Sequence, residues 1–156
     1  VMADNGEIYA TYTPEMVEGV KKLCDKADII TPNLTELRIL SGEENIFSGG
    51  EKMLQKGIKS VIVTGVVEGE EISNYVFYDG TAKKYKTEFI KSAKEGGSFS
   101  GTGDIFSSFV LGKILHGFSV FEEVEQAVEF ISKAIESSDI KNRNDGIDFE
   151  PFLKNI

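Results

Sequence analysis

Apolar residues of this chain gather in two short continuous runs, with stretches of helical spacing between and after them. The runs at residues 27–32 and 60–65 predict buried strands, and Pro32 ends the first. Continuous apolar runs are typical of strands buried on both faces, as in a parallel sheet. Helices between the two runs would supply the right-handed crossover that parallel strands need. The pattern therefore predicts an α/β fold.

Boundary signals place the remaining elements. Thr13-Pro14 opens the first helix, which ends near Cys24. Ser119 and Glu122 are spaced as a capping box for the last long helix. The other expected elements are helices at about 33–42, 49–56 and 103–115, a hairpin of residues 72–78 and 82–89 around Asp79-Gly80, and a polar loop over 137–148.

Composition narrows the class of protein. The 156 residues suffice for one domain with a hydrophobic core. A formal net charge of -9 disfavours nucleic acid or an anionic membrane as a partner, and a bound polyphosphate would need a cation. The single cysteine, Cys24, excludes an internal disulfide, and we expect its thiol to be buried. With neither a membrane-length apolar run nor a signal-peptide pattern, we expect a cytoplasmic protein.

A glycine-rich loop at residues 98–101 leads directly into an apolar helix. Gly101 and Gly103 let the backbone come close to a ligand, and the first N–H groups of the helix favour a phosphate. Asp104 lies in the first turn, where its carboxylate would repel that phosphate unless it takes a proton from an attacking hydroxyl. The stretch predicts phosphoryl transfer to an alcohol. The alternative is ordinary helix capping by an aspartate.

Polar residues also follow both predicted strands, where ligands gather in open α/β sheets. Glu36 could hold a hydrated magnesium ion, and Asn33 could bond a phosphate or a metal-bound water. The same pair is also spaced as a capping box, and the two interpretations are compatible. Thr64-Gly65 could meet nucleotide phosphates, or could be a strand running into a loop.

The first residues offer a weaker candidate. Asp4 could lie at the phosphate and metal end of a site, but Asp-Asn-Gly also forms turns without any ligand. Tyr9 and Tyr12 are near enough to line the same edge, with aromatic packing as the default interpretation. A single histidine, His116, makes a Ser-His-Asp hydrolase improbable and a histidine-rich metal site impossible.

Three motifs occur in order along the chain: Val-Met-Ala-Asp-Asn-Gly, Thr-Pro-Asn-Leu-Thr-Glu and Gly-Thr-Gly-Asp. Together they closely resemble the ribokinase-like superfamily, and within it the pyridoxal (vitamin B6) kinases. The resemblance implies a partial three-layer α/β/α fold, in which residues 1–156 form one partial domain. It also implies ATP and Mg2+, usually with a monovalent cation such as K+, and a homodimer.

The resemblance also implies roles for individual residues. Asp104 resembles the base that deprotonates the 5′-hydroxymethyl group of the vitamin in B6 salvage. Gly101, Thr102 and Gly103 resemble the anion hole for the γ-phosphoryl group. Residues similar to nucleotide and magnesium contacts of the family are Asn33, Glu36, Thr64, Gly65, Asp4 and Tyr12, with Glu36 and Asp4 reaching the metal through water.

Two departures from the family pattern matter. Ala3 replaces the usual glycine, which is a mild change. The chain also starts inside the first motif, whereas the family's preceding half supplies the first strands and most of the vitamin pocket. We therefore expect the ATP-binding half of a kinase, inactive alone and paired with another chain or with the missing half. The alternatives are a hydroxymethylpyrimidine or sugar kinase, although many pyrimidine kinases carry cysteine at the Asp104 position, and a non-catalytic nucleotide-binding module.

Overall fold

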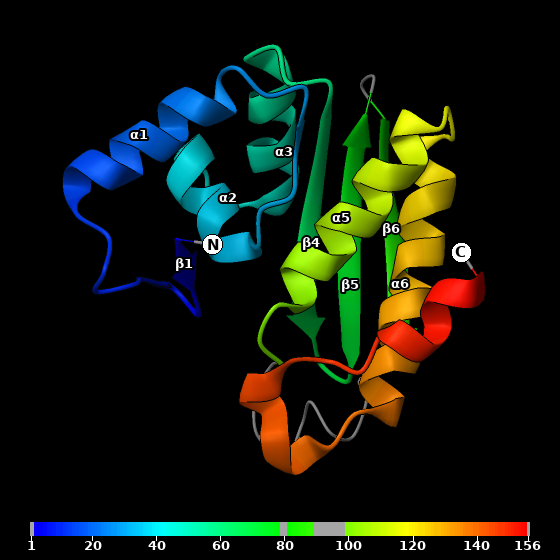
Figure 1. Ribbon diagram of the computed structural model, residues 1–156. Coiled ribbons are helices and arrows are strands. Elements are labelled where there is room, and N and C mark those ends of the chain that lie inside the picture. Colours follow the sequence, from blue (N-terminus) through cyan, green and yellow to red (C-terminus); the bar gives the residue numbers. More distant parts are fainter. Residues whose placement is uncertain (1, 79–80, 89–98, 156) are drawn as a thin grey trace. The chain divides into compact units, whose positions relative to one another are not determined.

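A computed structural model of the chain describes residues 2–78, 81–88 and 99–155 (Figure 1). The chain divides into two compact units. The first consists of Val1–Val66 with Ser73–Lys84, and the second of Val67–Ile72 with Tyr85–Ile156. None of the helices in the described ranges is long and apolar enough to cross a membrane.

Strands and helices alternate along the first part of the chain, as the apolar pattern predicts. The elements are β1 (Ala3–Asp4), β2 (Glu7–Ile8), α1 (Pro14–Cys24), β3 (Ile29–Ile30), α2 (Leu34–Ser41), α3 (Ile46–Gln55), β4 (Ser60–Glu68), β5 (Glu71–Tyr78) and β6 (Thr81–Glu88). One sheet has the order β3-β4-β5-β6, and β1 pairs with β2 alone. The predicted parallel pairing is confirmed, with Ile29 opposite Ser60 and Ile30 opposite Val61.

Side-chain caps begin the three helices of the first unit. The Thr13 hydroxyl accepts a hydrogen bond from the Met16 N–H at 3.3 Å, which confirms the predicted start of α1. Asn33 caps α2 in a complete capping box. The predicted start of α3 near Gly49 is wrong, because the Asn45 side chain caps the N–H groups of Phe47 and Ser48. The helix therefore begins at Ile46.

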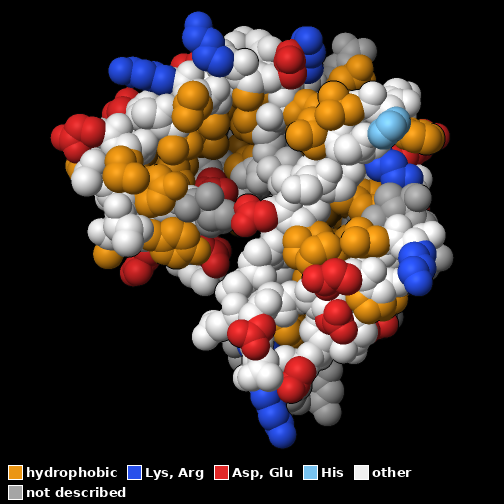
Figure 2. All heavy atoms as spheres, in the orientation of Figure 1, with side chains coloured by type: hydrophobic (Ala, Val, Ile, Leu, Met, Phe, Trp, Pro, Cys, Tyr) orange, Lys and Arg blue, Asp and Glu red, His pale blue; other side chains and the backbone are white. Residues whose placement is uncertain are grey.

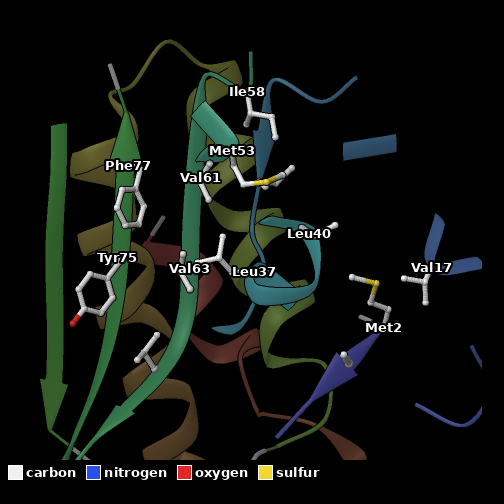
Figure 3. Packing of buried hydrophobic residues seen from close by; sticks show 13 residues of the cluster. Met2, Val17, Leu37, Leu40, Met53, Ile58, Val61, Val63, Tyr75 and Phe77 are labelled. Carbon is white, nitrogen blue, oxygen red and sulfur yellow. The ribbon is translucent and has the colours of Figure 1, made fainter. Parts of the chain in front are cut away.

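The core of the first unit lies between α2, α3 and strands β4 and β5 (Figure 3). Leu37 of α2 and Met53 of α3 are fully buried with Val61 and Val63 of β4. A Cβ built on Gly50 would lie 2.6 Å from the ring of Phe77, so glycine lets α3 approach β5 closely. This packing fixes α2, whose N-terminus carries the Asn33 motif.

Two helices dominate the second unit: α5 (Thr102–Leu115) and α6 (Val120–Ser137). They pack through the stacked rings of Phe109 and Phe130, whose centroids are 5.0 Å apart. The fully buried Glu123 carboxylate lies 3.9 Å from the Lys113 ammonium. Helix α6 buries an apolar stripe whose members include Val120, Val124, Ala127, Ile131 and Ala134.

Two predictions for this unit are wrong. Ser119 precedes α6 but makes no side-chain capping bond, so the expected capping box with Glu122 is not formed. The predicted loop over 137–148 contains a 3₁₀ helix, η1 (Ile140–Asp145), because the Asp139 carboxylate caps the Lys141 N–H at 2.9 Å. A second 3₁₀ helix, η2, covers Glu150–Asn155. Strands β5 and β6 are neighbours, as the predicted hairpin requires, and its Asp79-Gly80 turn lies outside the described residues.

Candidate functional site

Asn33 and Glu36 bond to each other and to the first motif. The Asn33 side-chain oxygen accepts from the Glu36 N–H at 2.9 Å, and one Glu36 oxygen accepts from the Asn33 N–H at 3.1 Å. The other Glu36 oxygen accepts from the Met2 N–H at 2.7 Å, while the Asn33 amide donates to the Ala3 carbonyl at 2.7 Å. Glu36 is 9% exposed. The capping-box interpretation is thereby confirmed, and the same contacts tie the first and second motifs together.

Thr64 lies beside this pair but within β4, which continues to Glu68, so the predicted strand end at Thr64-Gly65 is wrong. Asn33 and Thr64 face each other across an isolated parallel bridge, and the Thr64 N–H donates to the Pro32 carbonyl at 2.9 Å. Gly65 is exposed and adopts a φ of 67°, which glycine tolerates best. Its N–H donates to the buried Asn74 side chain of β5 at 3.2 Å. Sequence reasoning missed Asn74, because an isolated polar residue in a strand gives no motif.

Asp4 lies at the start of a two-residue hairpin turn. Asn5 and Gly6 have φ values of 49° and 85°, and the Asp4 carboxylate accepts from the Asn5 N–H at 2.9 Å. The turn interpretation of Asp-Asn-Gly is therefore confirmed. The Gly6 N–H also donates to the Thr35 hydroxyl at 2.9 Å, so the turn is attached to the second motif. Thr35 is a second positioning residue that sequence reasoning did not single out.

Two tyrosines flank this region. The pKa of Tyr9 is raised, first by its loss of water contact and then by the negative charges of Asp4 and Glu36. The negative charges of both carboxylates therefore disfavour ionisation of the same Tyr9 hydroxyl. Tyr12 is half-buried, packs against the core, and donates its N–H to the Tyr9 carbonyl at 2.8 Å. The packing interpretation of Tyr12 is confirmed, and its nucleotide contact stays a prediction.

The described residues of this chain contain no preformed cluster of metal-ligating side chains. Across residues 2–78, 81–88 and 99–155, no group of three or more His, Cys, Asp or Glu side chains is placed to hold a metal ion. Both Glu36 oxygens already accept backbone N–H groups. Magnesium commonly keeps several waters and uses one or two protein carboxylates. The contact of Asp4 and Glu36 with Mg2+ through water stays a prediction.

In the second unit, the N-terminus of α5 has the geometry of an anion cradle. Gly101 is the N-cap residue with a φ of 77°, and no side chain caps the helix. The first backbone hydrogen bond of the helix is donated by the Ile105 N–H to the Gly101 carbonyl at 3.0 Å. The N–H groups of residues 102–104 therefore have no acceptor within the helix. The Thr102 hydroxyl donates to the Phe99 carbonyl at 2.9 Å and so closes the loop.

This helix mouth is open to solvent. Gly101, Gly103 and Asp104 are exposed, and no described atom lies within 4 Å of a Cβ built on either glycine. The backbone there is thus accessible to a close-approaching ligand, and Asp104 lies in the same first turn of the helix. This arrangement can bind a phosphoryl group and accept a proton from a neighbouring hydroxyl.

Residues near the end of the chain hold the glycine-rich loop in place. The Ser100 N–H donates to the Arg143 carbonyl at 3.1 Å, and the Arg143 guanidinium lies 5.1 Å from the centre of the Phe99 ring. A Cβ on Gly146 would approach the Ser100 carbonyl to 3.3 Å. Sequence reasoning treated this segment as a polar loop, because a bond between segments so far apart has no local signature.

Residues 1–147 match the protein family described as phosphomethylpyrimidine kinase. The chain belongs to this family. It is 34% identical over 119 residues to the hydroxymethylpyrimidine/phosphomethylpyrimidine kinase of Aquifex aeolicus, matching 71% of this chain and 44% of that protein.

Solved structures of this kinase fold are similar over most of the chain. A Bacteroides thetaiotaomicron protein assigned as a phosphomethylpyrimidine kinase, crystallised with pyridoxal, has a TM-score of 0.84 and 32% identity, and the match covers 99% of this chain and 58% of that one. The ADP complex of Bacillus subtilis pyridoxal kinase has a TM-score of 0.71 and 27% identity, covering 89% and 53%. The chain thus spans about half the length of the relatives it matches.

The predicted resemblance to ribokinase-like kinases is confirmed, and so is the α/β fold class. Relatives of both acceptor classes match the chain, since one phosphorylates pyrimidines by its name and another pyridoxal. The B. subtilis relative was solved with ADP, and a Plasmodium falciparum relative was solved with AMP-PNP.

Proposed function

We propose that this chain is the nucleotide-binding part of an ATP-dependent kinase that phosphorylates the 5′-hydroxymethyl group of a B6 vitamer. The observation that carries the proposal is the open N-terminus of α5, which no side chain caps and whose first turn contains the exposed Asp104. Residues 102–104 would hold the γ-phosphoryl group, and Asp104 would take the proton of the acceptor hydroxyl.

A physical argument supports the base role of Asp104. A carboxylate beside a phosphate weakens phosphate binding, so it is useful there only if it carries out a chemical step. In-line attack by a neutral alcohol requires loss of a proton, and a carboxylate near the attacking oxygen can accept it. Bound ATP supplies the transferred group, and the N–H groups stabilise the charge on it.

In the first unit, Asn33, Thr64, Asp4 and Glu36 are the proposed nucleotide and cation contacts. Asn33 and Thr64 are bridged just beyond the end of β3, and ligands of open α/β sheets gather at the carboxyl ends of strands. Asp4 and Glu36 would attract Mg2+ through its water shell, which offsets the repulsion between ATP and a chain of net charge -9. Gly65 and Tyr12 remain proposed nucleotide contacts, and K+ remains a proposed second cation.

A hydroxymethylpyrimidine kinase is the second candidate, favoured by the match to the Aquifex aeolicus enzyme. The B6 acceptor is supported by the aspartate at position 104, where many pyrimidine kinases carry cysteine. It is also supported by the relative crystallised with pyridoxal. We infer that the chain acts only together with the part that its relatives have in addition.

A pair of fusion proteins tests the proposal. Each joins this chain to the part of one relative that it does not match, taken from the Bacteroides thetaiotaomicron protein or from the Aquifex aeolicus kinase. With Mg-ATP, we expect each fusion to phosphorylate pyridoxal about tenfold faster than hydroxymethylpyrimidine. The opposite order would favour the pyrimidine acceptor. Turnover by the unfused chain would contradict the inferred dependence on a second part.

A further inference from the structure

The glycine-rich loop before α5 is buried at Phe99 and open at Gly101. Phe99 is 4% exposed, whereas Ser100 and Gly101 are exposed. Gly101 has a φ of 77°, and no described atom lies within 4 Å of a Cβ built on it. The position of this exposed glycine, from which α5 starts, therefore depends on the contacts of the two residues before it.

Arg143 of η1 contacts both of these residues. Its carbonyl accepts from the Ser100 N–H at 3.1 Å and from the Gly146 N–H at 3.3 Å. Its guanidinium lies 5.1 Å from the centre of the Phe99 ring, within the range of a cation–π contact. One residue thus joins the turn that ends η1 to the loop that enters α5. In Figure 1 the orange η1 segment accordingly lies beside the start of that helix.

The geometry of η1 confines Arg143 from both sides. Asp139 caps the start of the segment, and Asn142 has a φ of -116° and a ψ of 44°, so the backbone kinks directly before Arg143. Gly146 ends the segment with a φ of 90°, and a Cβ built on it would approach the Ser100 carbonyl to 3.3 Å. The carbonyl and the side chain of Arg143 therefore reach the loop together.

We propose that Arg143 is a positioning residue for the terminal phosphoryl group of the bound nucleotide. This role rests on the proposed function, in which residues 102–104 hold that group. Arg143 acts through the loop, because it contacts Phe99 and Ser100. The Thr102 hydroxyl donates to the Phe99 carbonyl at 2.9 Å, so a shift of Phe99 displaces the first residue of α5. Loss of the Arg143 side chain should therefore weaken binding of the γ-phosphoryl group and change the binding of the other two phosphates little.

The charge of Arg143 lies in an acidic segment, which decides the control. Asp139, Asp145 and Asp148 are exposed in this segment, and Figure 2 shows acidic side chains at the lower end of the view, where η1 lies. Removing any cation here also weakens the attraction of an anionic nucleotide. Lys141→Met removes an equal charge from an exposed residue of the same 3₁₀ helix, and so isolates the effect of charge alone.

The test compares two nucleotides in the fusion with the B. thetaiotaomicron part, each variant being verified as folded by circular dichroism. Isothermal titration calorimetry gives the Kd of Mg-AMP-PNP, which carries a terminal phosphoryl group, and of Mg-ADP, which lacks one. We expect Arg143→Met to weaken Mg-AMP-PNP binding about tenfold and Mg-ADP binding less than about twofold. Lys141→Met should change both affinities by the same factor. A merely structural role of Arg143 would lower the stability of the fold without this selectivity.

A second variant tests whether Arg143 acts through Phe99. Phe99→Leu should give the same selective loss, and the double variant Arg143→Met/Phe99→Leu should lose no more than either single variant, because the two side chains form one contact. Additive losses, or an unchanged ratio of the two Kd values in Arg143→Met, would overturn the positioning role. Failure of the unsubstituted fusion to bind Mg-AMP-PNP would instead contradict the proposed function, and the positioning role with it.

Discussion

The Glu36 carboxylate accepts a hydrogen bond from the Met2 N–H at 2.7 Å, which joins residues 34 positions apart. The other oxygen of the same carboxylate completes the capping box with Asn33. Glu36 therefore bonds the first motif and the start of α2 at once. The same contacts therefore serve both interpretations of Glu36, as a helix cap and as a candidate site residue. A site formed by the first and second motifs needs these contacts to hold the two motifs together.

Replacing Glu36 should destabilise the first unit. Glu36→Ala leaves the buried Met2 N–H and the Asn33 N–H without their acceptor, so we expect a loss of about 2 to 4 kcal/mol in the free energy of unfolding. Urea denaturation followed by circular dichroism measures it. Glu44→Ala is the control, because Glu44 is 91% exposed in its ion pair with Arg38, and such pairs contribute little. Equal stabilities of the two variants would contradict this role of Glu36.

Two helical glycines should respond in opposite ways to alanine. Gly50→Ala forces a methyl group to within 2.6 Å of the Phe77 ring and should cost about 1 to 3 kcal/mol of unfolding free energy. Gly19→Ala meets no described atom within 4 Å and should stabilise α1 by about 0.5 to 1 kcal/mol. Thermal unfolding of both variants checks the difference. Loss of stability in Gly19→Ala, or none in Gly50→Ala, would show that the packing of α3 on β5 is wrong.

The thiol of Cys24 should titrate above its ordinary pKa of 9.0. Burial raises the pKa most, and the negative charges of Asp25 and Glu36 add to it, while Lys56 acts in the opposite direction. Cys24, predicted to be buried, is half-buried. The pKa of this thiol is higher in the folded chain than in the unfolded chain. The contribution of the thiol to the free energy of unfolding is therefore fully present below pH 9.0, and it is lost as the pH rises through the folded pKa. The pH profile of iodoacetamide alkylation should therefore be shifted upward relative to the profile in urea. Asp25→Asn should lower the midpoint, and an unchanged midpoint would contradict the assigned charge effect.

Much of the fold could be predicted because its signals are local. Thr13 and Asn33 cap helices within three residues of themselves, and the apolar runs mark β3 and β4 directly. The start of α3 was mispredicted because Gly49 and Gly50 look like a boundary. Glycine is favoured inside this helix for a tertiary reason, since Leu37 and Phe77 pack against these two positions.

The contacts that shape the candidate site could not be predicted in the same way. Ser119 has the spacing of a capping box, yet a rotatable hydroxyl makes the bond only if the surrounding packing directs it there. The bonds from Gly65 to Asn74 and from Ser100 to Arg143 join different elements, and neither pair has a characteristic spacing. The motifs therefore name candidate site residues, whereas some of the contacts that hold those residues come from residues without a motif.

Gly103 provides a test of the anion cradle that leaves the protein itself unstrained. A Cβ at Gly103 meets no described atom within 4 Å, so Gly103→Ala should fold normally and even stabilise α5 slightly. If a phosphoryl group lies against this backbone, the methyl group should weaken Mg-ATP binding by about tenfold in isothermal titration calorimetry. Gly112→Ala, farther along the same helix with equally open space, should bind as the parent chain does. Equal affinities of the two variants would remove the cradle from the nucleotide site.

The role of Asp104 is tested most directly by Asp104→Asn in the fusion with the B. thetaiotaomicron part. The side chain keeps its shape and its exposed position in the first turn of α5 but loses the basic oxygen. We expect kcat for pyridoxal to fall by about 100-fold or more, because general base catalysis contributes that much, while the Kd for Mg-ATP stays nearly unchanged. Glu129→Gln, an exposed charge change on α6, is the control. A kcat for Asp104→Asn equal to that of the control would contradict proton transfer to this carboxylate and the kinase site built around it.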